Sequence, residues 1–435
     1  MGLKVAIAGG GASHTPGIIL TLLNHKEFPV DEIRLYDNDS VQNDDMYLIV
    51  KTILAKKKLD VVLIKTEDPA VAFSGIDYIF SQLRVGKMQM REKDEKIPLA
   101  HDVVGQETCG LGGFAYGLRS MKGFVELIGY VQQYAPNAWV LNYTNPESII
   151  AECVRRAYPK AKIINACDMT IAIEELLCKS FGYNRDNWVP VYYGLNHFGW
   201  YHSIYDIELK RDVMPEIIQK MQTQGVNTEG MEPSWAHTYN NMCMITKHFP
   251  NNIPNNYLQY YLYPNRMVAE SDKNYTRANE IMDGRLKTIK EAVRAIKAGD
   301  PDAADGFAST EHGKYIVDIA ASILHNKNDR FMLIVPNKGA IPNLRQDAVV
   351  EVPCHVNATG AEPISLRFDI PDFHKGIMEA QVAAEKMLVD AFFEQSYQKA
   401  FEAFTLNQTI PNADVAKTVL DELLVANKDF WVNLH

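Results

Sequence analysis

Six short apolar runs, each separated from the next by a polar or helical segment, constrain the fold of the first part of the chain more than any other feature. Their length and their apolar character are typical of strands buried on both faces of a sheet. Strands that alternate with helices predict a parallel, doubly wound sheet, because parallel neighbours need a crossover connection. The predicted strands are 3–8, 32–37, 60–64, 78–80, 138–143 and 162–166.

The turn after the first predicted strand is rich in glycine. Gly9 and Gly11 match the first two glycines of the GxGxxG dinucleotide motif, whereas His14 stands where the third glycine is expected. The two glycines permit a tight turn and a close approach of the backbone to a pyrophosphate, and Ser13 belongs to the same predicted cofactor site. Asp37 ends the second predicted strand, where it would accept hydrogen bonds from ribose hydroxyls, although it lies 28 residues after Gly9 instead of the usual spacing of about 20. We therefore favour a dinucleotide-binding turn over a plain α/β turn. Of the two dinucleotides, we favour NAD over NADP.

Length, charge and cysteine content exclude several classes of protein. The 435 residues suit two or three domains, and a net charge of −10 argues against nucleic acid or an anionic membrane as the main partner. A local cluster of arginines could still bind an anionic ligand. No run approaches about 18 apolar residues and no signal peptide precedes the first strand, so no membrane span is indicated. The six cysteines show no CxxC pair and no framework spacing, which indicates reduced thiols in a cytoplasmic protein.

The pattern is less regular after about residue 169. A strand is predicted at 189–193, and helical periodicity dominates from 374 to 431. We predict an NAD-binding, Rossmann-like domain over 1–169. A C-terminal domain over 170–435 would contribute to substrate and metal binding and to oligomerisation.

Polar side chains follow two of the predicted strands. Cys167 and Asp168 come directly after the strand 162–166, and His197 follows the strand 189–193. Ligands of open α/β sheets bind outside the carboxyl ends of the strands, so these residues should converge there. Taken alone, Cys167 suits a small buried apolar residue and His197 a structural histidine. Together they could form a thiolate–imidazole site for a divalent metal, with positions left open for substrate oxygens.

Two further candidates have open alternatives. Asp168 could be an acid, or it could cap a helix that begins near Thr170. Tyr257 belongs to the tyrosine-rich run 257–263, which could be an aromatic packing cluster. Near a metal it could instead be a base, because positive charge lowers the pKa of a phenol.

A series of motifs occurs in a fixed order over nearly the whole chain. They are Gly9-Gly10-Gly11, Arg84-Val85-Gly86-Lys87, Val104-Gly105-Gln106-Glu107-Thr108, Asn142-Tyr143-Thr144-Asn145-Pro146, Cys167-Asp168-Met169, Gly194-Leu195-Asn196-His197-Phe198-Gly199, Tyr257-Leu258-Gln259-Tyr260-Tyr261 and Thr276-Arg277-Ala278-Asn279. With these motifs the chain resembles glycoside hydrolase family 4 and, within it, the 6-phospho-α-glucosidases. Asp168 and Met169 match the α-type members that act on phosphorylated sugars, whereas Thr170 stands where related sequences have proline.

The resemblance implies a fold, two cofactors and four residue roles. The fold is a Rossmann-type doubly wound parallel sheet followed by a lactate-dehydrogenase-like C-terminal α+β domain. The cofactors are NAD and a divalent metal, usually Mn²⁺. Cys167 and His197 match the metal ligands, Asp168 the general acid and Tyr257 the base.

The resemblance also implies a reaction, hydrolysis of α-linked 6-phosphoglucosides such as maltose 6′-phosphate to glucose 6-phosphate and the aglycone. It proceeds by NAD- and metal-assisted oxidation at C3, deprotonation at C2, elimination, water addition and re-reduction, an exception to the usual pair of carboxylates. Arg91, Asn145 and Arg277 match substrate-contacting positions. The family further suggests a homodimer or homotetramer.

Two other functions compete with this hypothesis. An NAD-dependent 2-hydroxyacid dehydrogenase would share the fold, produce net NADH and need no metal. A non-catalytic NAD-binding regulator would explain the glycine turn, but not the combination of Cys167, His197 and Tyr257.

Overall fold

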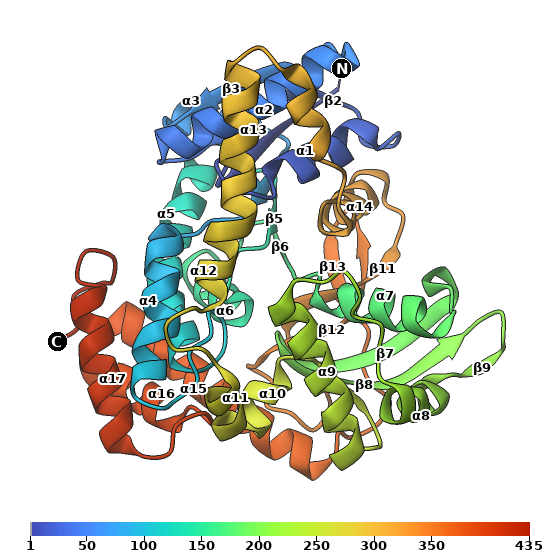
Figure 1. Cartoon of the computed structure of the whole chain (residues 1–435), viewed down its shortest axis with the longest axis vertical. Coiled ribbons are helices and arrows are strands. Elements are labelled where there is room, and N and C mark those ends of the chain that lie inside the picture. The colour runs from blue at the N-terminus through green and yellow to red at the C-terminus, as the bar shows by residue number, and fades with distance from the viewer. Residues whose placement is uncertain (1) are drawn as a thin grey trace.

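The computed structural model describes residues 2–435 of the chain, whose strands form one mixed sheet of 13 strands (Figure 1). Along the main path the strand order is β10-β8-β7-β12-β11-β6-β5-β4-β1-β2-β3. In addition, β13 pairs with β12 and β9 pairs with β8.

Strands β1 to β6 form the parallel half of this sheet. Their order, β3-β2-β1-β4-β5-β6, is the one typical of dinucleotide-binding domains. The bounds are β1 Leu3–Ala8, β2 Val30–Tyr36, β3 Val62–Thr66, β4 Tyr78–Ser81, β5 Trp139–Asn142 and β6 Ile163–Ala166. The predicted parallel, doubly wound sheet is confirmed, and β3 begins two residues later than expected because its pairing with β2 begins at Val62.

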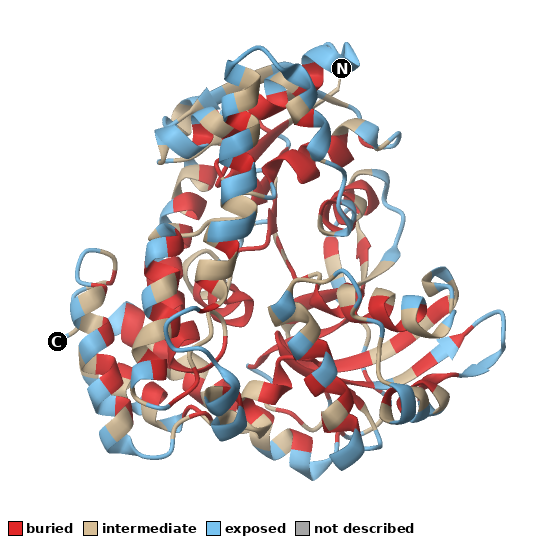
Figure 2. Cartoon of the chain, viewed as in Figure 1, coloured by how far each residue is buried: buried red, intermediate tan, exposed pale blue. Residues whose placement is uncertain are grey.

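Helices cover both faces of the parallel half. They are α1 Thr15–Asn24, α2 Ser40–Lys57, α3 Pro69–Phe73, α4 Lys87–Ala100, α5 Gly110–Tyr134, α6 Glu147–Ala157 and α7 Met169–Phe181. Along β1, Val5 and Ile7 belong to one hydrophobic cluster and Ala6 and Ala8 to another, so successive side chains enter cores on opposite faces. Figure 2 shows the buried strands inside and the exposed residues on the outer faces of the helices. Burial of each valine or isoleucine contributes about 1.5–3 kcal/mol to folding.

The other strands continue the sheet in antiparallel fashion beyond β6, where Leu333 of β11 pairs with Ala166. Their bounds are β7 Trp188–Leu195, β8 Phe198–Asp206, β9 Arg211–Asp212, β10 Ile253–Pro254, β11 Asp329–Pro336, β12 Val349–Asn357 and β13 Gly360–Pro363. The short helix η1 Arg185–Asn187 precedes β7, and α8 Met214–Gln224, α9 Pro233–His248 and α10 Leu258–Leu262 accompany these strands. This arrangement confirms the predicted α+β character of the C-terminal part.

A group of helices between residues 264 and 325 connects the antiparallel region back to the parallel half. They are α11 Pro264–Glu270, α12 Arg277–Ile281, η2 Met282–Leu286, α13 Lys287–Lys297, η3 Pro301–Gly306 and α14 Glu311–His325. The π-helical turn η2 joins α12 and α13 into one rod (Figure 1). Ala278 and Ile281 of this rod pack against Met88 of α4, and Ile289 and Val293 pack against α2.

The last three helices, α15 Asp372–Glu394, α16 Tyr397–Leu406 and α17 Ala413–Ala426, fold back onto the parallel half. Arg119 of α5 forms a fully buried ion pair with Asp94 of α4 and donates to the Asn427 side chain at 2.6 Å. Trp431 donates its indole N–H to the Ala115 carbonyl at 3.0 Å. These contacts cross position 169, so the proposed division into 1–169 and 170–435 stays a prediction.

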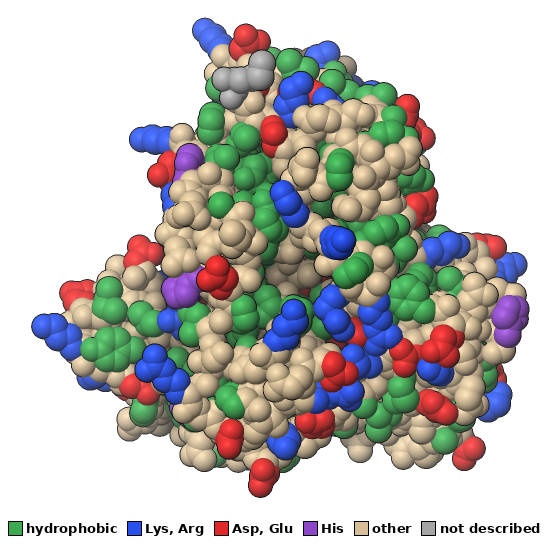
Figure 3. All heavy atoms as spheres, turned by 180° about the vertical axis from the view of Figure 1, so that it is seen from behind, with side chains coloured by type: hydrophobic (Ala, Val, Ile, Leu, Met, Phe, Trp, Pro, Cys, Tyr) green, Lys and Arg blue, Asp and Glu red, His purple; other side chains and the backbone are tan. Residues whose placement is uncertain are grey.

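The surface carries both signs of charge. On the rear face, Lys and Arg side chains lie interspersed with Asp and Glu side chains (Figure 3). Among residues 2–435, none of the helices combines the length and the apolar character that a bilayer-spanning segment needs.

Candidate active site

A cavity of about 1470 Å³ opens at the carboxyl ends of the parallel strands. It is larger than the several hundred Å³ typical of a pocket for one small ligand, and therefore has room for a cofactor beside a substrate. Every residue predicted from the sequence to belong to a site lines it. These residues are Gly9, Gly11, Ser13, Asp37, Arg91, Asn145, Cys167, Asp168, His197, Tyr257 and Arg277.

The glycine turn has the geometry that a dinucleotide needs. Gly9 has φ +84°, and a Cβ atom there would lie 2.8 Å from the carbonyl oxygen of Gln82. A Cβ atom on Gly11 would lie 2.8 Å from the Gln42 side chain. The Gly11 N–H donates to Asp37 at 2.8 Å, which fixes that carboxylate at the edge of the cavity. Burial raises the pKa of Asp37 from its ordinary value, against the opposing effect of its backbone hydrogen bonds.

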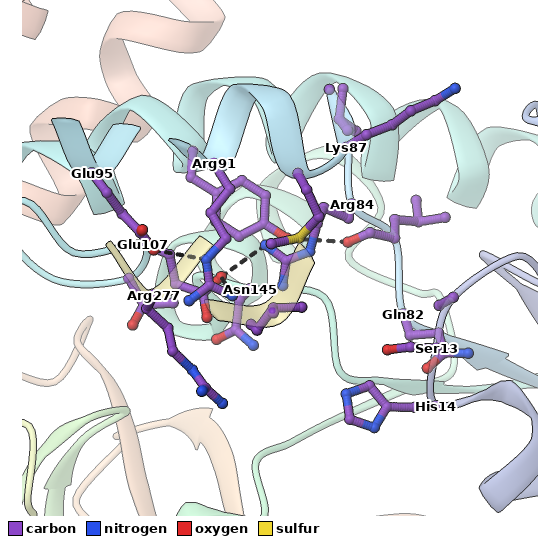
Figure 4. A pocket seen from close by; sticks show the side chains of 18 of the residues that line it. Ser13, His14, Gln82, Arg84, Lys87, Arg91, Glu95, Glu107, Asn145 and Arg277 are labelled. Atoms are coloured by element: carbon purple, nitrogen blue, oxygen red, sulfur yellow. Dashed lines mark hydrogen bonds and ion pairs between the residues drawn. The ribbon is translucent and has the colours of Figure 1, made fainter. Parts of the chain in front are cut away.

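His14, in the place of the motif's third glycine, faces the cavity between Ser13 and the start of α1 (Figure 4). Burial lowers its pKa to about 3, and the nearby charges of His312 and Arg285 act in the same direction, so the imidazole is neutral at pH 7. One turn later, α1 makes a close contact of a different kind. A Cβ atom on Gly17 of α1 would lie 3.0 Å from Thr310, just before α14.

Cys167 and His197 lie side by side at the centre of the cavity, with Sγ and Nε2 3.4 Å apart. Cys167 directly follows β6, and His197 lies in the tight turn between β7 and β8. The backbone of His197 is left-handed, with φ +62°, which is uncommon for a residue other than glycine. Strained residues of this kind cluster at functional sites, where the surrounding structure holds them in place.

Hydrogen bonds behind His197 fix its tautomer. The Thr108 hydroxyl donates to the Gln106 side chain at 3.0 Å, so it accepts from Nδ1–H of His197 at 3.1 Å. Nε2 therefore presents its lone pair toward Cys167. Burial lowers the pKa of His197 to about 4, although the negative charge of Glu107 opposes this, and the ring is neutral at pH 7.

This pair fits a borderline divalent cation. A neutral imidazole nitrogen and a cysteine sulfur are ligands that such ions accept, and a hydrogen bond such as that from Nδ1–H of His197 to Thr108 orients a ligating histidine. Burial and the charge of Glu351 raise the pKa of Cys167 well above its ordinary value, so a bound cation would have to stabilise the thiolate. Within residues 2–435 no cluster of three or more His, Cys, Asp and Glu side chains could hold a metal.

Asp168 occupies the N-cap position of α7, but its side chain caps no backbone N–H. The capping alternative is therefore wrong. Its carboxylate instead accepts a hydrogen bond from Nδ1 of His312 at 2.8 Å and is about one-third exposed to the cavity. Burial would raise the pKa of Asp168, but its electrostatic interaction and hydrogen bond with His312 outweigh this effect, and the net pKa is lowered.

Tyr257 immediately precedes α10 and lies beside the ring of His197, with ring centroids 4.3 Å apart. It also packs edge-on against Trp235 and parallel to Tyr260. Within the same run, Tyr261 packs against Phe198 away from the cavity, so the packing role predicted as an alternative applies to it. Burial raises the pKa of Tyr257 well above 10, and the charge of Glu107 adds to this.

Each arginine of the cavity is paired with an acid. Arg84 and Arg91 both contact one oxygen of Glu107 at 2.8 Å, and Arg91 also contacts Glu95 at 2.7 Å (Figure 4). Burial would raise the pKa of Glu107, but the two guanidinium groups lower it to about 2.

A second group of arginines lies on α12 and η2, the first two segments of the rod. Arg277 and Arg285 both bind Glu232, at the start of α9, and Arg277 also contacts Glu280 at 2.8 Å. Asn145 has a buried Oδ1 without a partner in the described residues and is available to a ligand in the cavity.

Sequence reasoning did not assign roles to several residues of the site. The segment Gln106-Glu107-Thr108 was recognised as a motif, but the role of Thr108 behind His197 carried no signal of its own. His312 and Arg285 lie in helices far along the chain, without a distinctive neighbouring pattern.

Comparisons with known proteins find related sequences over nearly the whole chain. The family 4 glycosyl hydrolase model matches residues 4–183, and the family 4 glycosyl hydrolase C-terminal domain matches residues 192–410. The chain is 45% identical to a 6-phospho-α-glucosidase of Leptotrichia buccalis, over 98% of each chain.

Two solved structures of 6-phospho-α-glucosidases from gut microorganisms are similar over 100% of both chains. One, in complex with NAD and Mn²⁺, superimposes with a TM-score of 0.97 at 38% identity. The other, in complex with NAD and glucose 6-phosphate, superimposes with a TM-score of 0.96 at 40% identity.

Proposed function

The chain belongs to family 4 of the glycosyl hydrolases, and from this premise we propose that it hydrolyses α-linked 6-phosphoglucosides with NAD and a divalent metal, Mn²⁺. The products are glucose 6-phosphate and the released aglycone, as from maltose 6′-phosphate. One observation carries the proposal: Cys167, His197, Asp168 and Tyr257 meet in the same cavity as the glycine turn. A dehydrogenase or an NAD-binding regulator has no need of this combination.

The cavity provides separate places for the two cofactors. We propose that Gly9, Gly11, Ser13 and Asp37 hold NAD, and that Cys167 and His197 hold the metal. When bound, NAD accepts and returns a hydride, and the divalent ion acts as a Lewis acid on sugar oxygens.

The acid and the base lie next to different members of the Cys167–His197 pair. Tyr257 packs on His197, and Asp168 follows Cys167 in the chain. A sugar ring over the pair would thus have its C2 proton near Tyr257 and its glycosidic oxygen near Asp168. Tyr257 removes the C2 proton. Asp168 is ionised in the free protein, so it must take up a proton when the substrate binds, and it gives that proton to the glycosidic oxygen as the bond to C1 breaks. A cation at the pair would oppose the effect of burial on Tyr257, because positive charge lowers the pKa of a phenol.

We assign the 6-phosphate to Arg277 in preference to Arg91. Each of the two arginines contacts two carboxylates, but the Arg277 side chain is 17% exposed whereas that of Arg91 is 6% exposed. A guanidinium group binds phosphate through two parallel hydrogen bonds. In this assignment Arg91 holds the carboxylate of Glu107 in place. Asn145 contacts the sugar through Oδ1, which has no partner in the described residues.

An assay on four nitrophenyl glucosides tests the proposed function. The purified protein, supplied with NAD⁺ and Mn²⁺, should cleave the α-glucoside 6-phosphate and leave the unphosphorylated α-glucoside and both β-glucosides essentially intact. Equal cleavage of the phosphorylated and unphosphorylated α-glucosides would contradict the substrate assignment.

Replacing Asp168 by asparagine removes the proposed proton donor. We expect kcat for maltose 6′-phosphate to fall by about 10²–10⁴-fold, because its sugar alkoxide is a poor leaving group that needs protonation. Nitrophenolate leaves readily without a proton, so kcat for the nitrophenyl substrate should change much less. Asp186→Asn, on the exposed helix η1, is the control and should leave both rates unchanged. An equal loss on both substrates would show that Asp168 is not the acid.

We also infer that the enzyme works in the cytoplasm as a homodimer or homotetramer. All six cysteines are unpaired in the part of the chain that the structure describes, as suits a reducing compartment. Light scattering on the enzyme as it elutes from a size-exclusion column would test the oligomeric state. A monomer at micromolar concentration would contradict the proposed dimer or tetramer.

A further inference from the structure

The carboxylate of Asp168 receives one side-chain hydrogen bond from the described residues, and its donor comes from a distant helix. Nδ1 of His312, in the first turn of α14, lies 2.8 Å from Oδ2 of Asp168. The other oxygen, Oδ1, has no side-chain donor within residues 2–435, and the carboxylate opens into the cavity. The two oxygens of the proposed acid thus have different surroundings.

His312 itself is held firmly. Its ring lies between those of Tyr143 and His14, with centroid distances of 4.2 and 4.9 Å. The Tyr143 hydroxyl donates to the backbone carbonyl of His312 at 3.3 Å. Nε2 is buried and has no partner among the residues that the structure describes, so the bond to Asp168 is the one polar anchor of the ring.

The start of α14 is also fixed to α1. Thr310 caps α14 by accepting from the N–H of Gly313 at 3.0 Å. Gly313 packs so closely on α1 that a Cβ atom would lie 2.7 Å from the Thr21 hydroxyl. The helix that carries His312 therefore cannot retreat from the cavity without separating from the helix that follows the glycine turn.

We propose that His312 is the positioning residue of the general acid. Its N–H holds Oδ2 of Asp168, which fixes the plane of the carboxyl group and leaves Oδ1 directed at the glycosidic oxygen. A carboxyl group that is free to rotate would spend less time in this orientation, and misplacement by about 1 Å can cost about 10²-fold in rate. This proposal rests on the proposed role of Asp168 as the acid.

Two substitutions separate the hydrogen bond from the packing. His312→Phe keeps a ring between Tyr143 and His14 but removes the donor. His312→Asn places an amide N–H near the position of Nδ1 but removes the ring. We expect His312→Phe to lower kcat for maltose 6′-phosphate by at least about tenfold, because the carboxyl group can then rotate away from the glycosidic oxygen. The nitrophenyl α-glucoside 6-phosphate, which needs little acid assistance, should lose no more than about twofold, and KM should change little for either substrate. His312→Asn should recover most of the lost rate on maltose 6′-phosphate.

The proposal is overturned if His312→Phe slows both substrates equally, if it slows neither, or if His312→Asn is as impaired as His312→Phe. Calorimetric titration with NAD⁺ and with Mn²⁺ should give affinities within about twofold for His312→Phe, since the variant keeps a ring against His14 and His312 forms no hydrogen bond to any proposed NAD or metal ligand. If this variant does not fold, His312→Leu replaces it in the same comparison. Asp168→Asn, measured in parallel, distinguishes the two levels of failure. If it slows both substrates equally, the acid assignment itself is wrong. If it is selective for maltose 6′-phosphate while His312→Phe is not, only the positioning role is wrong.

Discussion

Replacing Cys167 by serine should reduce kcat/KM by about a thousandfold or more, equivalent to about 4 kcal/mol of lost transition-state stabilisation. A serine hydroxyl is not deprotonated at neutral pH and is a poor ligand for a borderline divalent ion. His197 would then be the one remaining member of the pair that lies 3.4 Å apart. Calorimetric titration with Mn²⁺ should show binding lost or weakened in parallel with activity.

Cys178→Ser provides the matched control for this experiment. Cys178 is a buried thiol in α7, the helix that follows Cys167, but it lies outside the cavity. Its replacement should leave both Mn²⁺ affinity and kcat/KM nearly unchanged. Full activity of Cys167→Ser, or equal losses in the two variants, would contradict the assignment of Cys167 as a metal ligand.

Replacing Tyr257 by phenylalanine should lower kcat by about 10²–10⁴-fold, the usual contribution of a general base. The ring and its contact with His197 remain, so substrate and cofactor affinities should change little. The loss should appear on the nitrophenyl substrate as well as on maltose 6′-phosphate, because removal of the C2 proton precedes departure of either leaving group. This lack of selectivity distinguishes the base from the acid Asp168.

Tyr261→Phe, in the short helix α10 that Tyr257 precedes, is the control for Tyr257→Phe. Tyr261 packs on Phe198 outside the cavity, and removal of its hydroxyl should leave kcat within about twofold. If Tyr257→Phe were as active as Tyr261→Phe, another group would have to remove the C2 proton.

The arrangement of the site residues could be predicted because strand topology is simple to infer. The carboxyl ends of parallel strands share one edge of the sheet, so the glycine turn after β1, Asn145 after β5 and Cys167 after β6 had to converge there. His197 joins them from the antiparallel region, although β12 and β11 lie between β7 and the parallel half. The roles of Tyr257, Arg91 and Arg277, by contrast, rested on family resemblance, since neither periodicity nor spacing distinguishes them from packing or surface residues.

The remaining features depend on tertiary contacts that no local pattern encodes. His312 reaches Asp168 because α14 packs on α1 through Gly17 and Gly313, a contact between segments almost 300 residues apart. The left-handed backbone of His197 is a property of the β7–β8 turn. The net charge of −10 likewise does not predict the local ion pairs, in which each arginine of the cavity contacts a carboxylate.

The central claim is that NAD and a divalent metal take part in a hydrolysis that consumes neither. The most direct measurement is the rate of cleavage of nitrophenyl α-glucoside 6-phosphate by enzyme stripped of both cofactors, before and after each is added back, with NADH absorbance recorded alongside. We expect cleavage only when NAD⁺ and Mn²⁺ are both present, with no net accumulation of NADH. Cleavage at the full rate by the stripped enzyme, or formation of one NADH per product, would contradict the account.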